Sequence, residues 1–298
     1  MPILPYVERI AVVDQSARRA AVLRELQHLD CSFNVQREEI EGHRLENIVV
    51  PFGLGTPRLV IGAHYDSVPG STGANDNGSG AAILLDLVGT LHNGPLPAPL
   101  DVVFFDLEEP GLFGSRAYLK HVSPGDTCAM VNLDICGVGD TILVAPRANL
   151  EGGLLQSIVP LTVQDGAPPV QVMERLPRGD ETSFNQAGIP SVTVGVVPWE
   201  DVGLVKAFLN AEQGQQLART PSVAETIHNG CRDSIDAVQE TALQTMRRWL
   251  LRLVGQYLSR SGWPGGKEAT CGSDDARRSD AVLRPRGARG GAPHRPGV

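Results

Sequence analysis

The sequence has few cysteines and no pattern that would pair them. Its 298 residues include five cysteines, an odd number, and none of them forms a Cys-x-x-Cys motif. This usage argues against a disulfide framework and is typical of reduced thiols in a cytoplasmic protein.

The sequence also lacks a secretory signal and a transmembrane-length apolar run. Residues 1–19, MPILPYVERIAVVDQSARR, have no basic segment ahead of a long apolar one, and Glu8 and Asp14 interrupt the apolar positions. No apolar stretch reaches the roughly 20 residues that span a bilayer. We therefore expect a cytoplasmic location and no membrane partner.

Positive charge is scarce over most of the chain. The formal net charge is −8, and residues 261–298 carry seven basic and four acidic residues, so residues 1–260 carry 19 basic and 30 acidic ones. This acidic body argues against nucleic acid as a partner. The length and the 42% hydrophobic content suffice for one large domain or two small ones.

Residues 261–298 differ in composition from the rest. They include 8 Gly and 4 Pro among 38 residues and few large apolar groups, so they cannot bury enough surface to offset the entropy lost on folding. Their Arg and Gly content is compatible with weak RNA binding, but a solvated tail is the simpler interpretation. We expect a folded domain over residues 1–260 and a disordered tail over 261–298.

Apolar periodicity predicts alternating strands and helices. The expected helices cover residues 7–29, 78–91, 112–122, 150–162 and 237–259. The expected strands cover residues 31–36, 46–50, 58–63, 101–106, 128–135, 141–146 and 188–197. This order indicates an α/β fold around a mostly parallel sheet, in which ligands bind beyond the carboxyl ends of the strands.

Histidines and carboxylates gather at those strand ends. The segment GAHYDSVPGSTGANDNGSGAA, residues 62–82, follows an apolar strand, and FFDLEEPG and VNLDICG follow the same rule. Alone, each residue has an ordinary explanation: a helix cap, a solvated pair or a structural histidine. Together they favour a metal site with nitrogen and oxygen ligands, which suits zinc and less commonly cobalt or manganese. The candidate residues are His64, Asp66, Asp76, Glu108, Glu109, Asp134 and His228.

The ordered motifs AHYDSV, GANDNGSG, DLEEPGLFGS, NLDICG, GDETSFNQAGIPS and IHNG…DSID resemble the co-catalytic di-zinc aminopeptidases, the family of bacterial leucyl aminopeptidase and aminopeptidase Y. The resemblance spans roughly residues 45–255. It implies a zinc-exopeptidase fold: a single α/β domain with a mixed, mostly parallel central sheet flanked by helices. Residues 1–260 would then be a zinc peptidase catalytic domain.

The resemblance also implies a ligand set for two zinc ions, for which Co²⁺ or Mn²⁺ would be possible substitutes. His64 and Asp134 would hold one ion, Glu109 and His228 the other, and Asp76 would bridge them. A pair of zinc ions about 3.5–4 Å apart can share a water and polarise the scissile carbonyl.

Two further residues receive catalytic roles from the resemblance. Glu108 would be the general base that takes a proton from the bridging water and passes it to the leaving amine. Asp66 would hydrogen-bond His64 from behind and fix its tautomer. The peptide after the bridging aspartate, Asp76–Asn77, would be cis.

The sequence departs from the family pattern at two places. Asn229 follows His228 where a threonine is common, and Asp233 lies five residues after the histidine instead of four, which affects the loop more than the ligand. GDETSF replaces the commoner SDH motif, so we expect Asp180 and Glu181 to shape substrate binding differently.

The expected function is hydrolysis of the N-terminal peptide bond of a peptide with a free N-terminus. A glutaminyl-cyclase-like acyltransferase with one zinc would be favoured by loss of part of the ligand set, and a non-enzymatic ectodomain by loss of all of it; here all five positions are present. A di-zinc carboxypeptidase stays open, because direction depends on pocket residues. We expect residues 196–224 to form part of that pocket, without a readable preference.

Removing residues 261–298 should leave folding and catalysis almost unchanged, because no candidate ligand and no periodic apolar segment lies there. Thermal unfolding and turnover of the truncated chain are the measurements. A large loss of either would show that the tail is an integral part of the fold.

Overall fold

The computed structural model describes residues 1–92, 96, 98–123, 125–147, 169–211, 219–228 and 232–259. None of the helices in these residues combines the length and the apolar character that crossing a bilayer requires.

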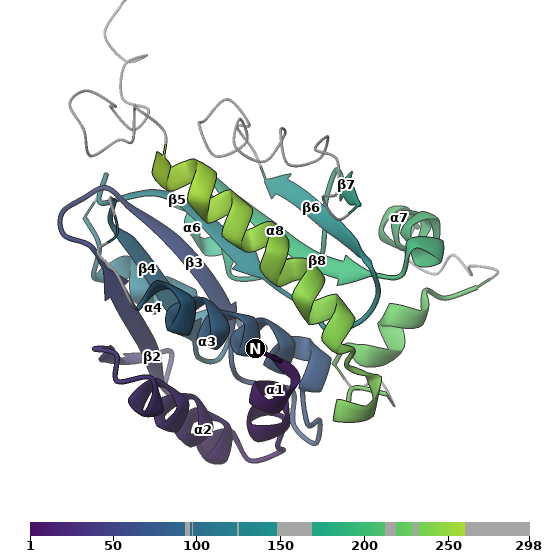
Figure 1. Ribbon diagram of the computed structural model, residues 1–298, viewed down its shortest axis with the longest axis horizontal. Helices are drawn as coiled ribbons and strands as arrows, with labels where there is room; N and C mark the ends of the chain where they lie inside the picture. The colour runs from purple at the N-terminus through teal and green to yellow at the C-terminus, as the bar shows by residue number, and fades with distance from the viewer. Residues whose placement is uncertain are drawn as a thin grey trace, which may run out of the picture.

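The core of the molecule is one eight-stranded mixed sheet (Figure 1). The strands are β1 (Asn34–Ile40), β2 (His43–Phe52), β3 (Arg58–His64), β4 (Leu100–Phe105), β5 (Thr127–Leu133), β6 (Thr141–Arg147), β7 (Val170–Val172) and β8 (Ser191–Val197). Their order across the sheet is β1-β2-β4-β3-β5-β8-β6-β7. The pairs β4-β3, β3-β5, β5-β8 and β6-β7 are parallel, and the other three are antiparallel. The predicted mixed, mostly parallel sheet is confirmed.

The central strands are apolar because both of their faces are covered. Every residue of β4, β5 and β8 is buried, as are all but the first residue of β3. Continuous apolar runs of this kind are typical of parallel strands between two helical layers. In the register, His64 at the end of β3 lies opposite Phe105 at the end of β4, and Gly62 lies opposite Asn132 in β5. Three neighbouring parallel strands therefore end at one edge of the sheet.

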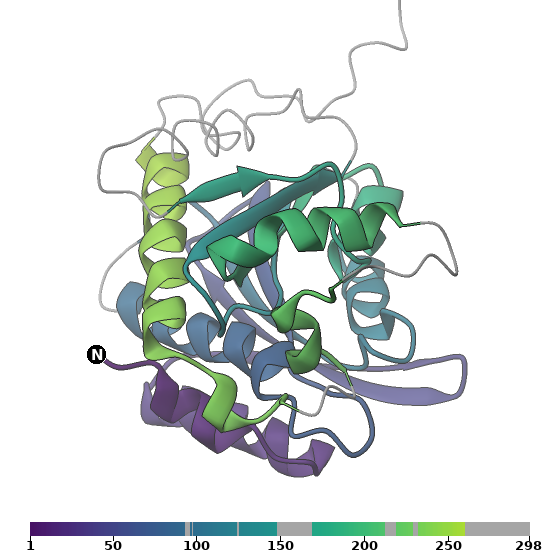
Figure 2. The ribbon, with the colours of Figure 1, turned by 90° about the vertical axis from the view of Figure 1, so that its right-hand side faces the viewer.

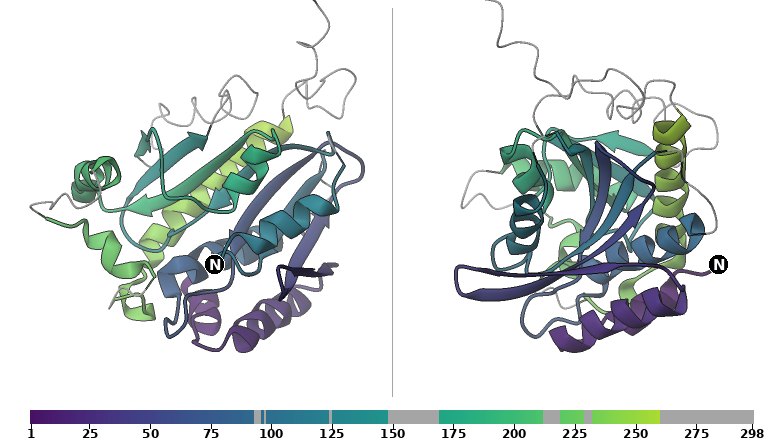
Figure 3. Two further views of the ribbon diagram at one scale, coloured as in Figure 1. Left: turned by 180° about the vertical axis from the view of Figure 1, so that it is seen from behind. Right: turned by 90° about the vertical axis from the view of Figure 1, so that its left-hand side faces the viewer.

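Helices cover both faces of the sheet, as Figures 2 and 3 show. On one face, α3 (Gly80–Leu91) packs on β3 and β4 and α8 (Glu240–Ser259) on β6 and β8. The helices α1 (Leu4–Ile10) and α2 (Gln15–His28) pack against α3 in the same layer. On the other face, α4 (Phe113–Lys120) and α6 (Glu181–Gln186) contact β2 and β8, while α7 (Val202–Asn210) follows β8.

The N-terminal residues of the chain are hydrogen-bonded directly to the start of the last helix, α8. The carboxylate of Glu240, at the start of α8, accepts hydrogen bonds from the backbone amides of Ile3, at 2.9 and 3.0 Å, and Leu4, at 2.8 Å. Since α1 begins at Leu4, this carboxylate also lies at its positive N-terminal end.

The single helix predicted over residues 7–29 is wrong, because the chain forms two helices separated by residues 11–14. Asp14 caps the second helix by accepting a hydrogen bond from the amide of Ala17 at 2.7 Å. The first strand begins at Asn34 instead of residue 31, and the helix expected from residue 78 begins at Gly80.

Three sequence expectations are left with little or no structural test. The helix expected over residues 150–162 and the tail over 261–298 lie outside the described residues, so the domain boundary at residue 260 stays a prediction. Among the described cysteines, Cys31, Cys128 and Cys136 are buried, and none of these three forms a disulfide.

Candidate metal centre

Three of the predicted ligands lie where parallel strands end. His64 is the last residue of β3, Asp134 follows the last residue of β5, and Glu109 lies in the loop after β4. The amide of Asp134 donates to the carbonyl of Val194 at 2.9 Å, which extends the pairing of β5 with β8 by one residue. The sheet thus determines the backbone positions of these ligands.

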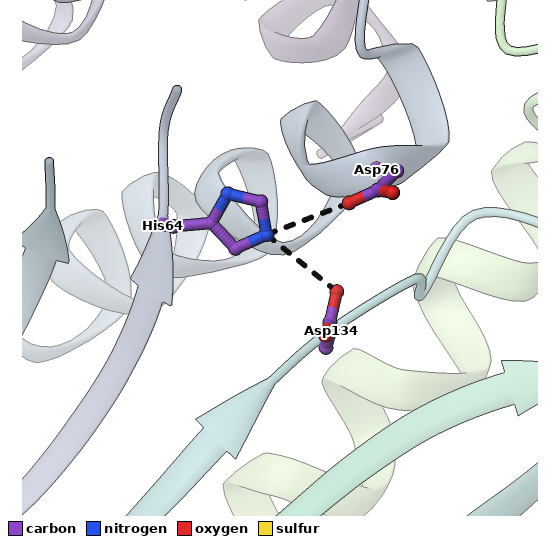
Figure 4. Close-up of side chains that lie close together, drawn as sticks. All are labelled: His64, Asp76 and Asp134. Carbon is purple, nitrogen blue, oxygen red and sulfur yellow. Dashed lines mark ion pairs between the residues drawn. The ribbon is translucent and has the colours of Figure 1, made fainter. Parts of the chain in front are cut away.

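His64 and two carboxylates form the first group of donor atoms (Figure 4). The Nε2 atom of His64 lies 3.5 Å from Oδ1 of Asp76 and 3.8 Å from Oδ1 of Asp134. Both His64 and Asp76 are buried. Three donors around one small space match the nitrogen and oxygen ligand set of a zinc site.

Asp76 also belongs to a second group of donor atoms. Its Oδ2 atom lies 3.9 Å from Nε2 of His228, and that nitrogen lies 3.5 Å from Oε2 of Glu109. The candidate ligand atoms within each group all lie within 4.8 Å of one another. Asp76 therefore turns one oxygen toward each group, which is the arrangement a bridging carboxylate requires.

A network of side-chain amides holds the turn that carries Asp76. This turn is a π-helical segment, Ala74–Ser79, with a cis peptide at Asp76–Asn77, as predicted. Asn77 donates from Nδ2 to the carbonyl of Leu133 at 2.7 Å, and the Oδ1 atom of Asn75 accepts from the amide of Gly137 at 2.7 Å. Both asparagines connect the turn to the chain around Asp134. Sequence reasoning did not single them out, although they flank Asp76 in the motif GANDNG.

Asp66 contacts both the histidine and the glutamate loop. Its Oδ1 atom lies 3.4 Å from Nδ1 of His64, on the side of the ring away from the donor group. The same carboxylate accepts hydrogen bonds from the amides of Glu108 at 3.0 Å and Glu109 at 3.2 Å. The second contact was not foreseen from the sequence, because it depends on β3 and β4 being neighbours.

The donor set has unsatisfied buried oxygens, as a cation site should. Oε1 of Glu109 and Oδ1 of Asp134 are buried and have no hydrogen-bond partner among the described residues. Burial, together with the charge of Asp76, raises the pKa of Glu109 to about 8. Burial, together with the charge of Asp180, raises the pKa of Glu108 to about 10. Carboxylates crowded in this way are stabilised by a multivalent cation, so the residues present fit zinc.

The donor groups open into a cavity of about 750 Å³. Glu108 lines the cavity, and Arg178 is the one Lys or Arg among its described lining residues. Most of the remaining wall is apolar: Ile135, Leu143, Leu176, Val197, Phe208, Ala224 and Ile227. Val197, Phe208 and Ala224 belong to the segment 196–224, so the expectation that this segment contributes to the pocket is confirmed.

Asp180 and Glu181 depart from the family pattern, and their effect on substrate binding stays a prediction. Both are fully buried, and neither is among the described residues that line the cavity. Burial raises the pKa of Asp180 to about 7, against the opposing effect of His64. Arg178, which directly precedes the GDETSF motif, lines the cavity, although the sequence did not single it out.

Comparison with known proteins places these residues in a family. The model of Peptidase family M28 matches residues 47–254. Aminopeptidase YwaD of Bacillus subtilis is 40% identical over 91 residues, which are 29% of this chain and 20% of YwaD. The matched segment is thus a small part of that relative.

Solved structures share the fold. BSAP, a zinc aminopeptidase from Bacillus subtilis, superimposes with a TM-score of 0.56 at 23% identity, over 72% of this chain and 50% of that chain. A glutaminyl cyclase from Porphyromonas gingivalis superimposes with a TM-score of 0.61 at 20% identity, over 86% of this chain and 97% of that chain. At these identities the similarities establish the fold alone, and the chemistry has to be argued from the residues of the site.

Substitutions should change zinc content in a graded way. Protein purified without chelators should hold about two zinc ions per chain. Asp76→Ala should lose both, because it removes an oxygen from each donor group, whereas His228→Ala should lose one. Elemental analysis of each purified variant measures this.

The matched control is His121→Ala. This histidine is exposed and lies outside the donor groups, and its Nε2 atom pairs with Oε1 of Glu38 at a distance of 2.6 Å. Equal zinc loss in the Asp76 and His228 variants, or no zinc in the wild type, would contradict the two-group arrangement.

Proposed function

Because the chain belongs to peptidase family M28, we propose that it is a zinc-dependent aminopeptidase that removes the N-terminal residue of peptides. The observation that carries this proposal is the position of Asp76, whose two oxygens face two separate groups of donor atoms.

We assign the five donors to two zinc ions. His64 and Asp134 would hold one ion, Glu109 and His228 would hold the other, and Asp76 would offer one oxygen to each. Zinc bound there would supply Lewis acidity, which would polarise the scissile carbonyl and make water a better nucleophile at neutral pH. Asp66 fixes the ring of His64 and, through two amide hydrogen bonds, the backbone of the glutamate loop.

Glu108 is the proton carrier of this proposal. It lines the cavity next to Glu109, and its backbone amide is held by Asp66. A cation at the donor groups would lower the raised pKa of Glu108, and its carboxylate would then take a proton from the attacking water and return it to the amine that leaves.

The walls of the cavity indicate the substrate. Their apolar side chains favour a peptide whose first residue is apolar, since burying such a side chain stabilises the complex by roughly 1.5–3 kcal/mol. In this proposal the partner is a peptide with a free N-terminus and an apolar first residue. The cytoplasmic location expected from the sequence stays a prediction.

Arg178 favours one second candidate, a di-zinc carboxypeptidase. Its side chain is exposed and lines the cavity, and a guanidinium binds a carboxylate in a fork. A C-terminal carboxylate would then sit at Arg178 and the scissile bond would be the last one of the peptide. The glutaminyl-cyclase alternative has support from the shared fold alone, and the second donor group counts against a site for one zinc.

A panel of short peptides tests the function and its direction. The zinc-loaded protein should release leucine or phenylalanine from peptides with a free N-terminus, and acetylation of that terminus should abolish release. Amidation of the C-terminus should have little effect. The reverse pattern would establish a carboxypeptidase, and conversion of an N-terminal glutamine to a cyclic product without hydrolysis would establish a cyclase.

Glu108→Gln should separate binding from chemistry. The amide should leave both zinc ions and the fold in place, while the loss of a general base lowers turnover by about 10²–10⁴-fold with little change in substrate binding. Glu109→Gln should lower zinc content and activity together. Zinc content and turnover number are measured on both variants. Near-normal turnover of Glu108→Gln, or metal loss in that variant alone, would reverse the assignment.

A further inference from the structure

A buried arginine lies behind the metal centre. Arg18, in α2, is 0% exposed, and it donates all three of its hydrogen bonds among the described residues to backbone carbonyls. Its Nε atom donates to Tyr65 at 2.6 Å, Nη2 donates to Gly73 at 3.2 Å, and Nη1 donates to Thr72. A buried guanidinium is costly unless it is compensated, so these contacts hold both the arginine and its acceptors in place.

The three acceptors belong to the segment that connects two of the ligands. Tyr65 directly follows His64, and Thr72 and Gly73 lead into the π-helical turn that carries Asp76. Gly73 has a φ of +55°, and a Cβ there would lie 2.9 Å from Nη1 of Arg18 and 2.5 Å from Cβ of Ser67. At Gly73 the backbone therefore lies so close to the guanidinium of Arg18 that a side chain there would crowd it.

A second side chain of α2 contacts the same segment. Gln15 donates from Nε2 to the carbonyl of Ser67 at 2.8 Å, and its Oε1 atom accepts from the amide of Ser67 at 3.3 Å. The contact between α2 and residues 65–73 is thus made by one charged and one neutral side chain. Both lie ahead of residues 47–254, where the family model matches.

We propose that Arg18 is a positioning residue for the metal centre: its guanidinium holds residues 65–73 so that His64 and Asp76 face each other across the first donor group. This inference rests on the proposed zinc site and adds a residue from outside the family-matched segment. Arg18 belongs to neither donor group and is not among the described residues that line the cavity, so it would act through the backbone of residues 65–73.

The sign of the effect separates positioning from charge. The carboxylates of Asp66, Asp76, Glu109 and Asp233 surround Arg18 closely enough to support its protonation against burial. If Arg18 acted through its charge alone, Arg18→Lys would leave zinc binding unchanged, and a variant without the charge would bind zinc more tightly because the site would be more negative. A positioning role predicts weaker binding in Arg18→Lys, because misplaced ligands bind zinc more weakly.

Arg18→Lys keeps the charge and loses the three-pronged geometry. We expect its zinc affinity, measured by competition with a chelator of known affinity, to fall about 10–100-fold, the usual effect of losing a residue that orients metal ligands. Gln15→Ala is a milder variant of the same contact, and its affinity should fall by less. It keeps the test decisive if Arg18→Lys does not fold.

Arg58→Lys is the matched control, because Arg58 begins β3 as His64 ends it. Arg58 also donates to backbone carbonyls, those of Phe52 and Leu100 at 2.9 Å and Gly55 at 3.1 Å, and it pairs with Asp101 at 2.7 Å. Its loss should lower thermal stability and leave zinc affinity unchanged.

The outcomes are distinct. Weaker zinc binding in the Arg18 and Gln15 variants, with the Arg58 variant unchanged, supports the proposal. Unchanged or tighter binding in the α2 variants, or equal weakening in Arg58→Lys, overturns it. A wild type that binds no zinc overturns the proposed function itself, whereas a wild type with two zinc ions and unaffected α2 variants overturns only the role of Arg18.

Discussion

Repulsion among buried carboxylates is the constraint on which the rest of the site depends. Each buried carboxylate must find donors or a cation, since leaving it unpaired costs several kcal/mol or more. Some are satisfied within the chain: Asp66 accepts from two backbone amides, and Asp233 accepts from Ser71 at 2.8 Å and from the amide of Asn75 at 2.8 Å. Others, such as Asp134, retain buried oxygens without a hydrogen bond among the described residues. Hydrogen bonds thus compensate Asp66 and Asp233, whereas a cation at the donor groups would compensate Asp134.

The parallel strands make this crowding possible. Because β3, β4 and β5 run in one direction, their carboxyl ends deliver His64, the glutamate loop and Asp134 to one edge from segments far apart in sequence. The two remaining donors come from irregular segments, the turn around Asp76 and the loop of His228. These loops are joined through Asp76 itself, whose Oδ2 atom accepts from the amide of His228 at 2.9 Å. The sheet thus determines where His64, Glu109 and Asp134 lie, and side-chain hydrogen bonds determine where Asp76 and His228 lie.

The sequence could predict the strands and the chemical character of the strand ends, because both follow from local patterns: apolar runs for β3, β4 and β5, and polar residues directly after them. It could not predict the partners of Arg18, which are carbonyls 47 to 55 residues away. Every residue has a backbone carbonyl, so the residue types in the sequence do not reveal which ones accept these hydrogen bonds. The break between α1 and α2 was missed because apolar spacing continues across it, although Asp14 is a common capping residue. Arg178 was missed because its role depends on which face of a loop meets the cavity.

The clamp between Glu240 and the amides of Ile3 and Leu4 bears on the order in which this molecule is built. The partners are 236 and 237 residues apart, so the first helix cannot make these contacts during synthesis until Glu240 has been made. His228 emerges just before Glu240, whereas His64 emerges far earlier. The clamp and the donor group that contains His228 therefore form late in synthesis, compared with the strands that carry His64 and Asp134.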